Sequence, residues 1–180
     1  MPGTRWWTVK NRLVDRMRAT TGFRSPGEDG DEDLALLYDG REWQMTGDYS
    51  PAYLVIGGSI ERDDDGTLGQ DWGPIGGRAR DEGGRIVCNA IAERGDIVFD
   101  DEGLATNVPQ DTWRTLGATC EAIVNALEAN IRSDPALGFT SADGFPYLTT
   151  QIDGVEPRSY FTPTGAVVSA VVVVTYSTRI

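Results

Sequence analysis

A nine-residue run near the C-terminus constrains the fold of this chain more than any other segment. Between residues 166 and 174 every residue except Ser169 is apolar, and valine fills six of the nine positions. A membrane-spanning helix needs roughly 20 apolar residues, so this run is too short to be one. Its dense β-branched side chains are typical of a strand covered on both faces. The run therefore predicts a strand inside a sheet, with the C-terminal segment as part of the core.

Two other segments carry the apolar spacing of amphipathic helices. The first covers residues 4–20, where apolar side chains recur at steps of three and four. The second covers residues 113–131. Pro109 is placed to begin its first turn, and Asp134-Pro135 is expected to end the helix. Its apolar stripe consists of Trp113, Leu116, Cys120, Ile123, Leu127 and Ile131.

Short strands are predicted around these helices, separated by turn residues. Besides the terminal run, they cover residues 34–38, 52–56, 85–94, 147–152 and 159–161, and residues 41–45 are a candidate hairpin partner of the first. Asp153-Gly154 and residues 163–165 are expected as turns. Because the strands cluster and only two helices cover them, we expect an α+β fold with a mixed, largely antiparallel sheet packed by two main helices.

The length of 180 residues fits a single domain, residues 1–180, with a sizeable core. Residues 57–84 hold nine glycines and few apolar side chains. A stretch of this kind inside a compact domain is usually a functional loop. We therefore expect a long projecting loop or hairpin there.

Several classes of catalytic and metal site are excluded by composition. The chain has no histidine, which removes Ser-His-Asp and Cys-His arrangements and His-ligated zinc. Cys88 and Cys120 lie on apolar faces of predicted elements and are expected to be buried free thiols. We therefore expect that the protein is not an enzyme and that it binds neither a cofactor nor a metal ion.

Acidic clusters are the remaining candidates for a metal site. The acids at residues 29, 31 and 33 have calcium-loop spacing, but Leu34 stands where that loop requires glycine and Gly40 where it requires glutamate. The run Asp63, Asp64 and Asp65 also has no glutamate at the required distance. Solvated acidic loops are favoured, and weak calcium affinity is the alternative.

Charge is distributed unevenly along the chain. Residues 1–24 carry six basic residues and one acid, 6 − 1 = +5, and the remainder carries 10 − 27 = −17, which together give −12. This balance opposes general nucleic-acid binding. The basic segment is a candidate assembly interface through Arg12, Arg16 and Arg18, and a solvated helix face is the alternative interpretation. Basic residues interrupt the N-terminal segment, so neither a signal peptide nor a membrane span is expected.

The predicted elements of the C-terminal half follow one another in a distinctive order. A long amphipathic helix precedes a D-P-x-L-G turn at residues 134–138, and the apolar strand Gly165 to Tyr176 follows a threonine-rich turn. Together with the N-terminal helix and the strand I-V-C-N-A-I at residues 86–91, this resembles the tail terminator proteins of long-tailed bacteriophages. The element order and the Asp-Pro-Leu-Gly turn carry the resemblance, which covers most of the chain.

The resemblance implies a structural virion protein that assembles as a homohexameric ring. Such a ring caps the head-proximal end of the tail tube and meets the head–tail connector, so the implied partners are further copies, the tail tube protein and the connector or stopper protein. It is made in the host bacterial cytoplasm and resides in the virion tail. Six copies would carry 6 × −12 = −72, which would repel the genomic DNA passing through.

Two alternative functions remain open at this point. One is another neck component, a head–tail stopper or connector protein of similar size and charge. The other is a small enzyme or ligand-binding domain that uses the acid-rich loops. Oligomeric mass separates the second alternative from the ring proteins.

Overall fold

A mixed β-sheet forms the framework of the protein, as shown by a computed structural model that describes residues 4–27, 34–40, 51–57, 81–163 and 165–179. Within these ranges the sheet has six strands in the order β1-β2-β3-β4-β6-β5. The elements in chain order are α1 (Thr4–Arg18), β1 (Phe23–Arg24), β2 (Ala35–Asp39), β3 (Ala52–Ile56), β4 (Asp81–Arg94), α2 (Thr112–Ser133), the 3-10 helix η2 (Ser141–Asp143), β5 (Thr149–Thr162) and β6 (Gly165–Arg179).

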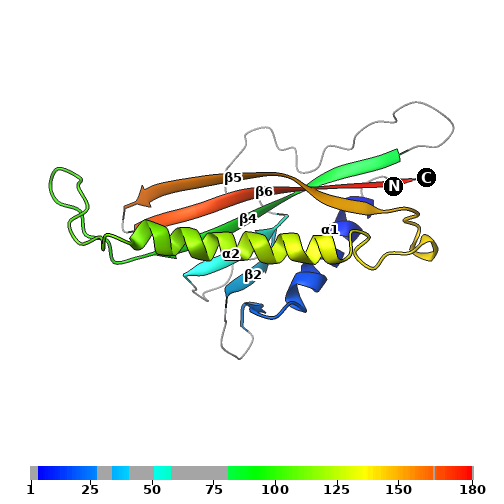
Figure 1. Cartoon of the computed structure of the whole chain (residues 1–180), viewed down its shortest axis with the longest axis horizontal. Helices are drawn as coiled ribbons and strands as arrows, with labels where there is room; N and C mark the ends of the chain where they lie inside the picture. Colours follow the sequence, from blue (N-terminus) through cyan, green and yellow to red (C-terminus); the bar gives the residue numbers. More distant parts are fainter. Residues whose placement is uncertain (1–3, 28–33, 41–50, 58–80, 164, 180) are drawn as a thin grey trace.

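The terminal strand β6 lies inside the sheet, as the apolar run predicted. It pairs antiparallel with β4 on one side and with β5 on the other, so that Val172 lies between Cys88 and Val155. These three long strands run along the long axis of the molecule (Figure 1). β1, β2 and β3 pair in parallel, and β3 joins β4 antiparallel. The α+β fold with a mixed, largely antiparallel sheet is confirmed.

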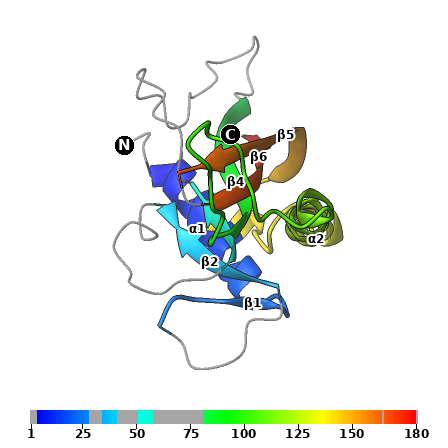
Figure 2. The same ribbon diagram turned by 90° about the vertical axis from the view of Figure 1, so that its left-hand side faces the viewer.

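Both helices pack on the same face of this sheet. Figure 2 shows α2 nearly end-on beside β4, β6 and β5. The α2 stripe is buried against the even-numbered residues of β4 and β6, and α1 adds its apolar face to the same core. The most deeply buried side chains of this core include Leu13, Met17, Leu54, Ile86, Ile123 and Leu127.

The opposite face of the sheet is less evenly covered. Leu36, Tyr38 and Val55 form a second buried cluster there, with the Tyr53 ring edge-on to Tyr38 at 6.0 Å between centroids. On β6, Val171 and Val173 point to this face and are half-buried. β6 is therefore fully buried on the helical face and only partly on the other.

Several element boundaries differ from the sequence-based expectation. β5 is one continuous strand, and the expected turn at Asp153-Gly154 is instead a bulge between Ile152 and Gly154. β4 begins at Asp81, so residues 81–84 belong to the sheet. The helix α2 begins at Thr112, whose amide donates to the Pro109 carbonyl in a preceding turn. Residues 41–45 and 58–80, including the expected hairpin partner and most of the projecting loop, lie outside the described residues.

One glycine leaves room for an aromatic ring near the end of the β4–β6 pair. A Cβ placed at Gly84 would lie 2.7 Å from Oη and 2.8 Å from Cε1 of Tyr176. The bare backbone of Gly84 therefore makes room for the Tyr176 ring, which is buried on the helical face.

Among the helices in the described ranges, none is long and apolar enough to cross a bilayer.

Candidate interaction surfaces

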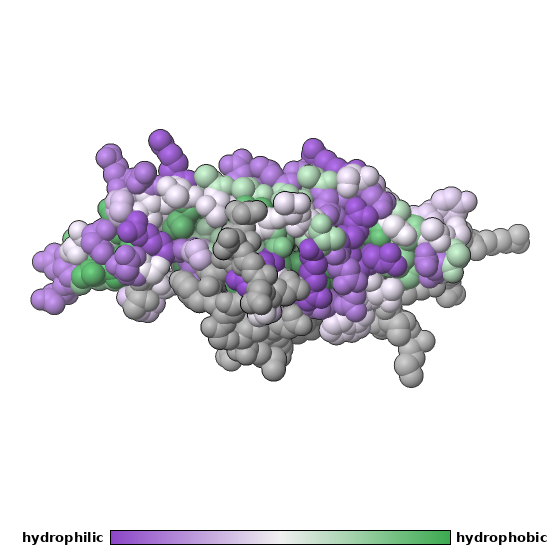
Figure 3. Space-filling model, turned by 90° about the horizontal axis from the view of Figure 1, so that it is seen from below, coloured by the Kyte–Doolittle hydropathy of each residue, from purple (hydrophilic) through white to green (hydrophobic). Residues whose placement is uncertain are grey.

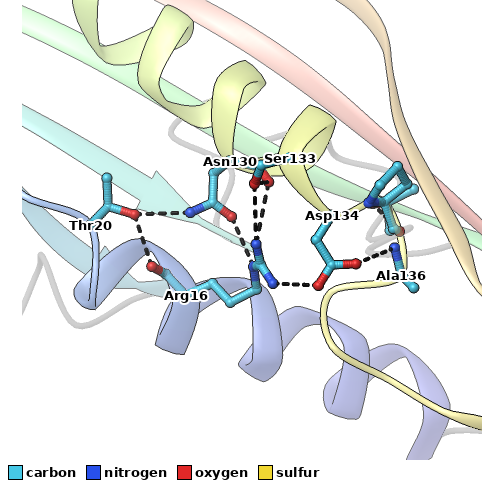
Figure 4. Close-up of polar contacts among 8 residues, drawn as sticks. Arg16, Thr20, Asn130, Ser133, Asp134 and Ala136 are labelled. Atoms are coloured by element: carbon cyan, nitrogen blue, oxygen red, sulfur yellow. Dashed lines mark hydrogen bonds and ion pairs between the residues drawn. The ribbon is translucent and has the colours of Figure 1, made fainter.

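A polar junction ties α1 to the C-terminal end of α2 (Figure 4). Arg16 donates from Nε to Oδ1 of Asn130 across 3.0 Å and from Nη1 to Oδ2 of Asp134 across 2.7 Å. Asn130 in turn donates from Nδ2 to Oγ1 of Thr20 across 2.9 Å. The cation of Arg16 is thus used within the chain, where it also faces the negative end of the α2 dipole.

The Asp-Pro-x-Leu-Gly turn extends this junction to β5. The Asp134 carboxylate accepts from the Ala136 amide across 3.2 Å, and the Pro135 carbonyl accepts from both the amide and the hydroxyl of Thr150 at 2.8 Å. Leu137 is fully buried with a positive φ of 51°. The turn therefore joins α1, α2 and β5, which is a structural role.

The three arginines proposed for assembly occupy different environments. Arg12 is half-buried, with its guanidinium carbon 4.5 Å from the centroid of the Phe139 ring. Arg16 is half-buried in the junction, and Arg18 is exposed at the end of α1. Assembly through these residues remains a prediction, and of the three side chains Arg18 is the exposed one.

Lys10 on α1 also forms its ion pair within the chain. Its side chain is only 2% exposed, and Nζ forms an ion pair with the Asp39 carboxylate at the end of β2. The same nitrogen lies 4.6 Å from the centroid of the Trp7 ring. Trp7 is itself 57% exposed, so α1 presents an aromatic surface beside a buried ion pair.

A small hairpin projects beyond the end of the sheet, between β4 and α2 (Figure 1). We call residues 96–107 the distal hairpin. Phe99 pairs with Ala105 in a single antiparallel bridge, flanked by bonds from the Thr106 amide to the Val98 carbonyl and from the Asp100 amide to the Leu104 carbonyl, both at 2.9 Å. This register places Phe99 and Ala105 on one side, and Val98 and Leu104 diagonally together on the other.

Side chains hold the distal hairpin in one conformation. Oδ1 of Asp100 accepts from the amides of Glu102 and Leu104 across 3.0 and 2.8 Å. Asn107 bridges the base, accepting from the Val98 amide and donating to the Asp96 carbonyl, both across 2.7 Å. The tip and the base of the hairpin are therefore both fixed by hydrogen bonds.

The inner side of the distal hairpin packs on an aromatic cluster. The Phe99 and Phe161 rings meet edge-on with centroids 5.4 Å apart, and Trp113 meets Phe161 at 5.0 Å. This cluster links the hairpin to the end of β5 and the first turn of α2. Phe161 is nevertheless 47% exposed, so the aromatic cluster reaches the surface.

The outer side of the distal hairpin exposes aliphatic side chains within an acidic rim. Val98 is 56% exposed and Leu104 is 62% exposed. The hairpin carries four acids, Asp96, Asp100, Asp101 and Glu102, and no basic residue. Figure 3 shows apolar surface among hydrophilic residues at the same end of the molecule. Rigid apolar groups held in water with charges around them are typical of protein–protein contact surfaces.

Catalytic chemistry finds little support among the described residues. Burial raises the pKa of the Cys88 thiol to about 12, partly offset by a hydrogen bond with the Gly57 backbone, and raises the pKa of Cys120 to about 11. Both are free thiols in the core and would be poor nucleophiles. In the described ranges no group of three or more Cys, Asp or Glu residues is placed to hold a metal ion. Asp63, Asp64 and Asp65 lie outside those ranges.

The distal hairpin was not predicted from the sequence, although a signal for it is present. Asp-Asp-Glu-Gly at residues 100–103 is a turn-forming run between the apolar pairs Val98-Phe99 and Leu104-Ala105. Each arm holds too few residues to give a clear alternation. The turn composition was therefore the available clue.

Neither a protein-family profile nor a curated protein sequence matches this chain.

Proposed function

We propose that this protein is a structural virion protein that forms a ring on the head-proximal end of a phage tail tube and joins the tube to the head connector. The observation that carries the proposal is the distal hairpin, which holds Val98 and Leu104 exposed on a hydrogen-bonded frame. Ordered apolar groups in water favour association over turnover. The order of helices and strands, and the resemblance in the C-terminal half, give this association its proposed setting.

What supports a mechanical role is how the fold uses its polar groups. Arg16, Asn130 and Asp134 fasten the two helices together, and the turn after α2 fastens them to β5. These polar contacts hold α1, α2 and β5 in fixed relative positions, which suits a component that must bind the end of a tube.

Electron microscopy of negatively stained protein tests the proposal. The purified chain is imaged alone and after mixing with tail tubes of the phage that encodes it, and its mass is measured by light scattering. Rings with a mass several times 19.6 kDa, bound at one end of each tube, are expected. Binding to the isolated connector but not to tubes would favour a stopper or connector protein instead. Monomers that bind neither would overturn the proposal.

A further inference from the structure

We propose that the distal hairpin of one copy docks on the exposed face of α1 of a second copy, so that subunits associate head to tail. This inference rests on the proposed function only for the closure of the contact into a ring. It assigns the two surfaces of the contact, the outer side of the hairpin and the Trp7 face of α1.

Both surfaces present apolar side chains to water. On the hairpin these are Val98 and Leu104, and on α1 it is Trp7, all three more than half exposed. Trp7 and Arg18 are eleven positions apart, close to three full helical turns, so they lie along the same side of α1. Asn11, between them, is also exposed on this side. The face is thus aromatic at one end and cationic at the other.

Charge favours a second copy as the occupant. The distal hairpin carries four acids and no base, whereas residues 1–24 carry +5. Within the chain, Asp39 and Asp134 pair with Lys10 and Arg16 of that segment, and Asp96 of the hairpin pairs with Arg94. The remainder of the chain is acidic, so α1 is the region of a neighbouring copy that attracts the hairpin.

The two surfaces are too far apart to satisfy each other within one chain. The distal hairpin projects past the start of α2, while α1 lies toward the opposite end of the molecule, beside the C-terminal end of α2 (Figure 1). Unlike and complementary surfaces on one subunit give a heterologous contact. Repeating that contact produces a ring when the rotation between neighbours closes.

A charge-swap experiment tests the contact directly. Sedimentation velocity across a concentration and salt series is run for wild type, Leu104→Ser, Arg18→Glu, Glu102→Arg and the double variant Arg18→Glu/Glu102→Arg. The side chain of Glu102 makes no bond within the hairpin frame described above, so its reversal leaves that frame intact. Tyr147→Ser is the matched control, because Tyr147 is 81% exposed and lies outside both surfaces. Circular dichroism melts confirm that each variant is folded.

We expect Leu104→Ser and both single reversals to weaken self-association about tenfold or more, as truncation of a contact centre does. The double variant should regain much of the wild-type association, and high salt should weaken wild type because exposed charges are screened. A monomeric wild type, or variants that associate like Tyr147→Ser, would overturn the inference. Self-association through this contact without binding to tail tubes would overturn the proposed function and leave the inference standing.

Discussion

Nη1 of Arg16 on α1 donates to Oδ2 of Asp134, the residue at which α2 ends, across 2.7 Å. The two side chains are separated by 118 positions in the sequence, and 24% and 36% of their surfaces are exposed. The bond fastens the N-terminal helix to the turn that leads into β5. The charged side chain of Arg16 therefore stabilises the packing of α1 against the end of α2 within the subunit.

Replacement of Arg16 by alanine should destabilise the subunit. A hydrogen-bonded charge pair of this kind is half-exposed, so we expect the free energy of unfolding to fall by about 1–2 kcal/mol, as measured in urea. Arg132→Ala is the control, since Arg132 is 77% exposed and pairs with Glu128 on its own helix. That change should cost less than about 0.5 kcal/mol. Equal losses for the two variants would show that the junction contributes no more than a surface pair.

The buried Lys10–Asp39 pair should respond asymmetrically to mutation. Asp39→Ala leaves the Lys10 ammonium, 2% exposed, without this carboxylate, and we expect a loss of about 3 kcal/mol. Adding Lys10→Met removes the stranded charge and keeps the volume, so the double variant should recover much of that stability. Urea unfolding of the two single variants and the double variant provides a thermodynamic cycle. Additive losses would contradict a direct coupling between the two side chains.

The sheet was largely predictable because its signals are local. β3 occupies the predicted residues 52–56, and the valine-rich run is internal as its composition indicated. β5 was divided in the prediction because Asp153-Gly154 has turn composition. Pairing of the fourteen-residue strand β5 with β6 overrides that local preference, and Asp153 is accommodated in a bulge between Ile152 and Gly154.

The roles of the basic side chains were less predictable, for a physical reason. Helical spacing shows which residues share a side of α1, but it does not show what packs against that side. Arg16 finds Asn130 and Asp134, and Lys10 finds Asp39, through tertiary contacts between distant segments. Part of the positive charge of this segment is therefore paired within the fold and is not presented at the surface.

The two faces of β6 should differ in their tolerance of truncated side chains. Val172 is fully buried on the helical face, while its neighbour Val173 is half-buried on the other. We expect Val172→Ala to lower the free energy of unfolding by about 2 kcal/mol and Val173→Ala by about 1 kcal/mol or less. The pair is matched because residue type, strand and substitution are the same. A larger loss at Val173 would mean that the second face is the better packed one.

Both thiols should resist alkylation in the folded protein. Burial raises the pKa of Cys88 to about 12 and that of Cys120 to about 11, so little of either thiol is ionised at pH 8.5. Iodoacetamide pulses followed by mass spectrometry should label the native chain slowly and the urea-unfolded chain at both sites. Rapid labelling of the native chain would contradict the buried positions of these residues.

The same pKa shifts set an alkaline limit on stability. In the unfolded chain the thiols ionise near pH 9.0, whereas in the folded chain they remain protonated until about pH 11 to 12. Folding therefore opposes ionisation, so this contribution is intact below pH 9 and is lost as pH rises from 9 toward those folded values. Urea midpoints should fall over that range in wild type and fall less steeply in Cys88→Val, which removes the larger shift. Parallel profiles for the two proteins would show that other groups, such as tyrosines or lysine, set the alkaline limit.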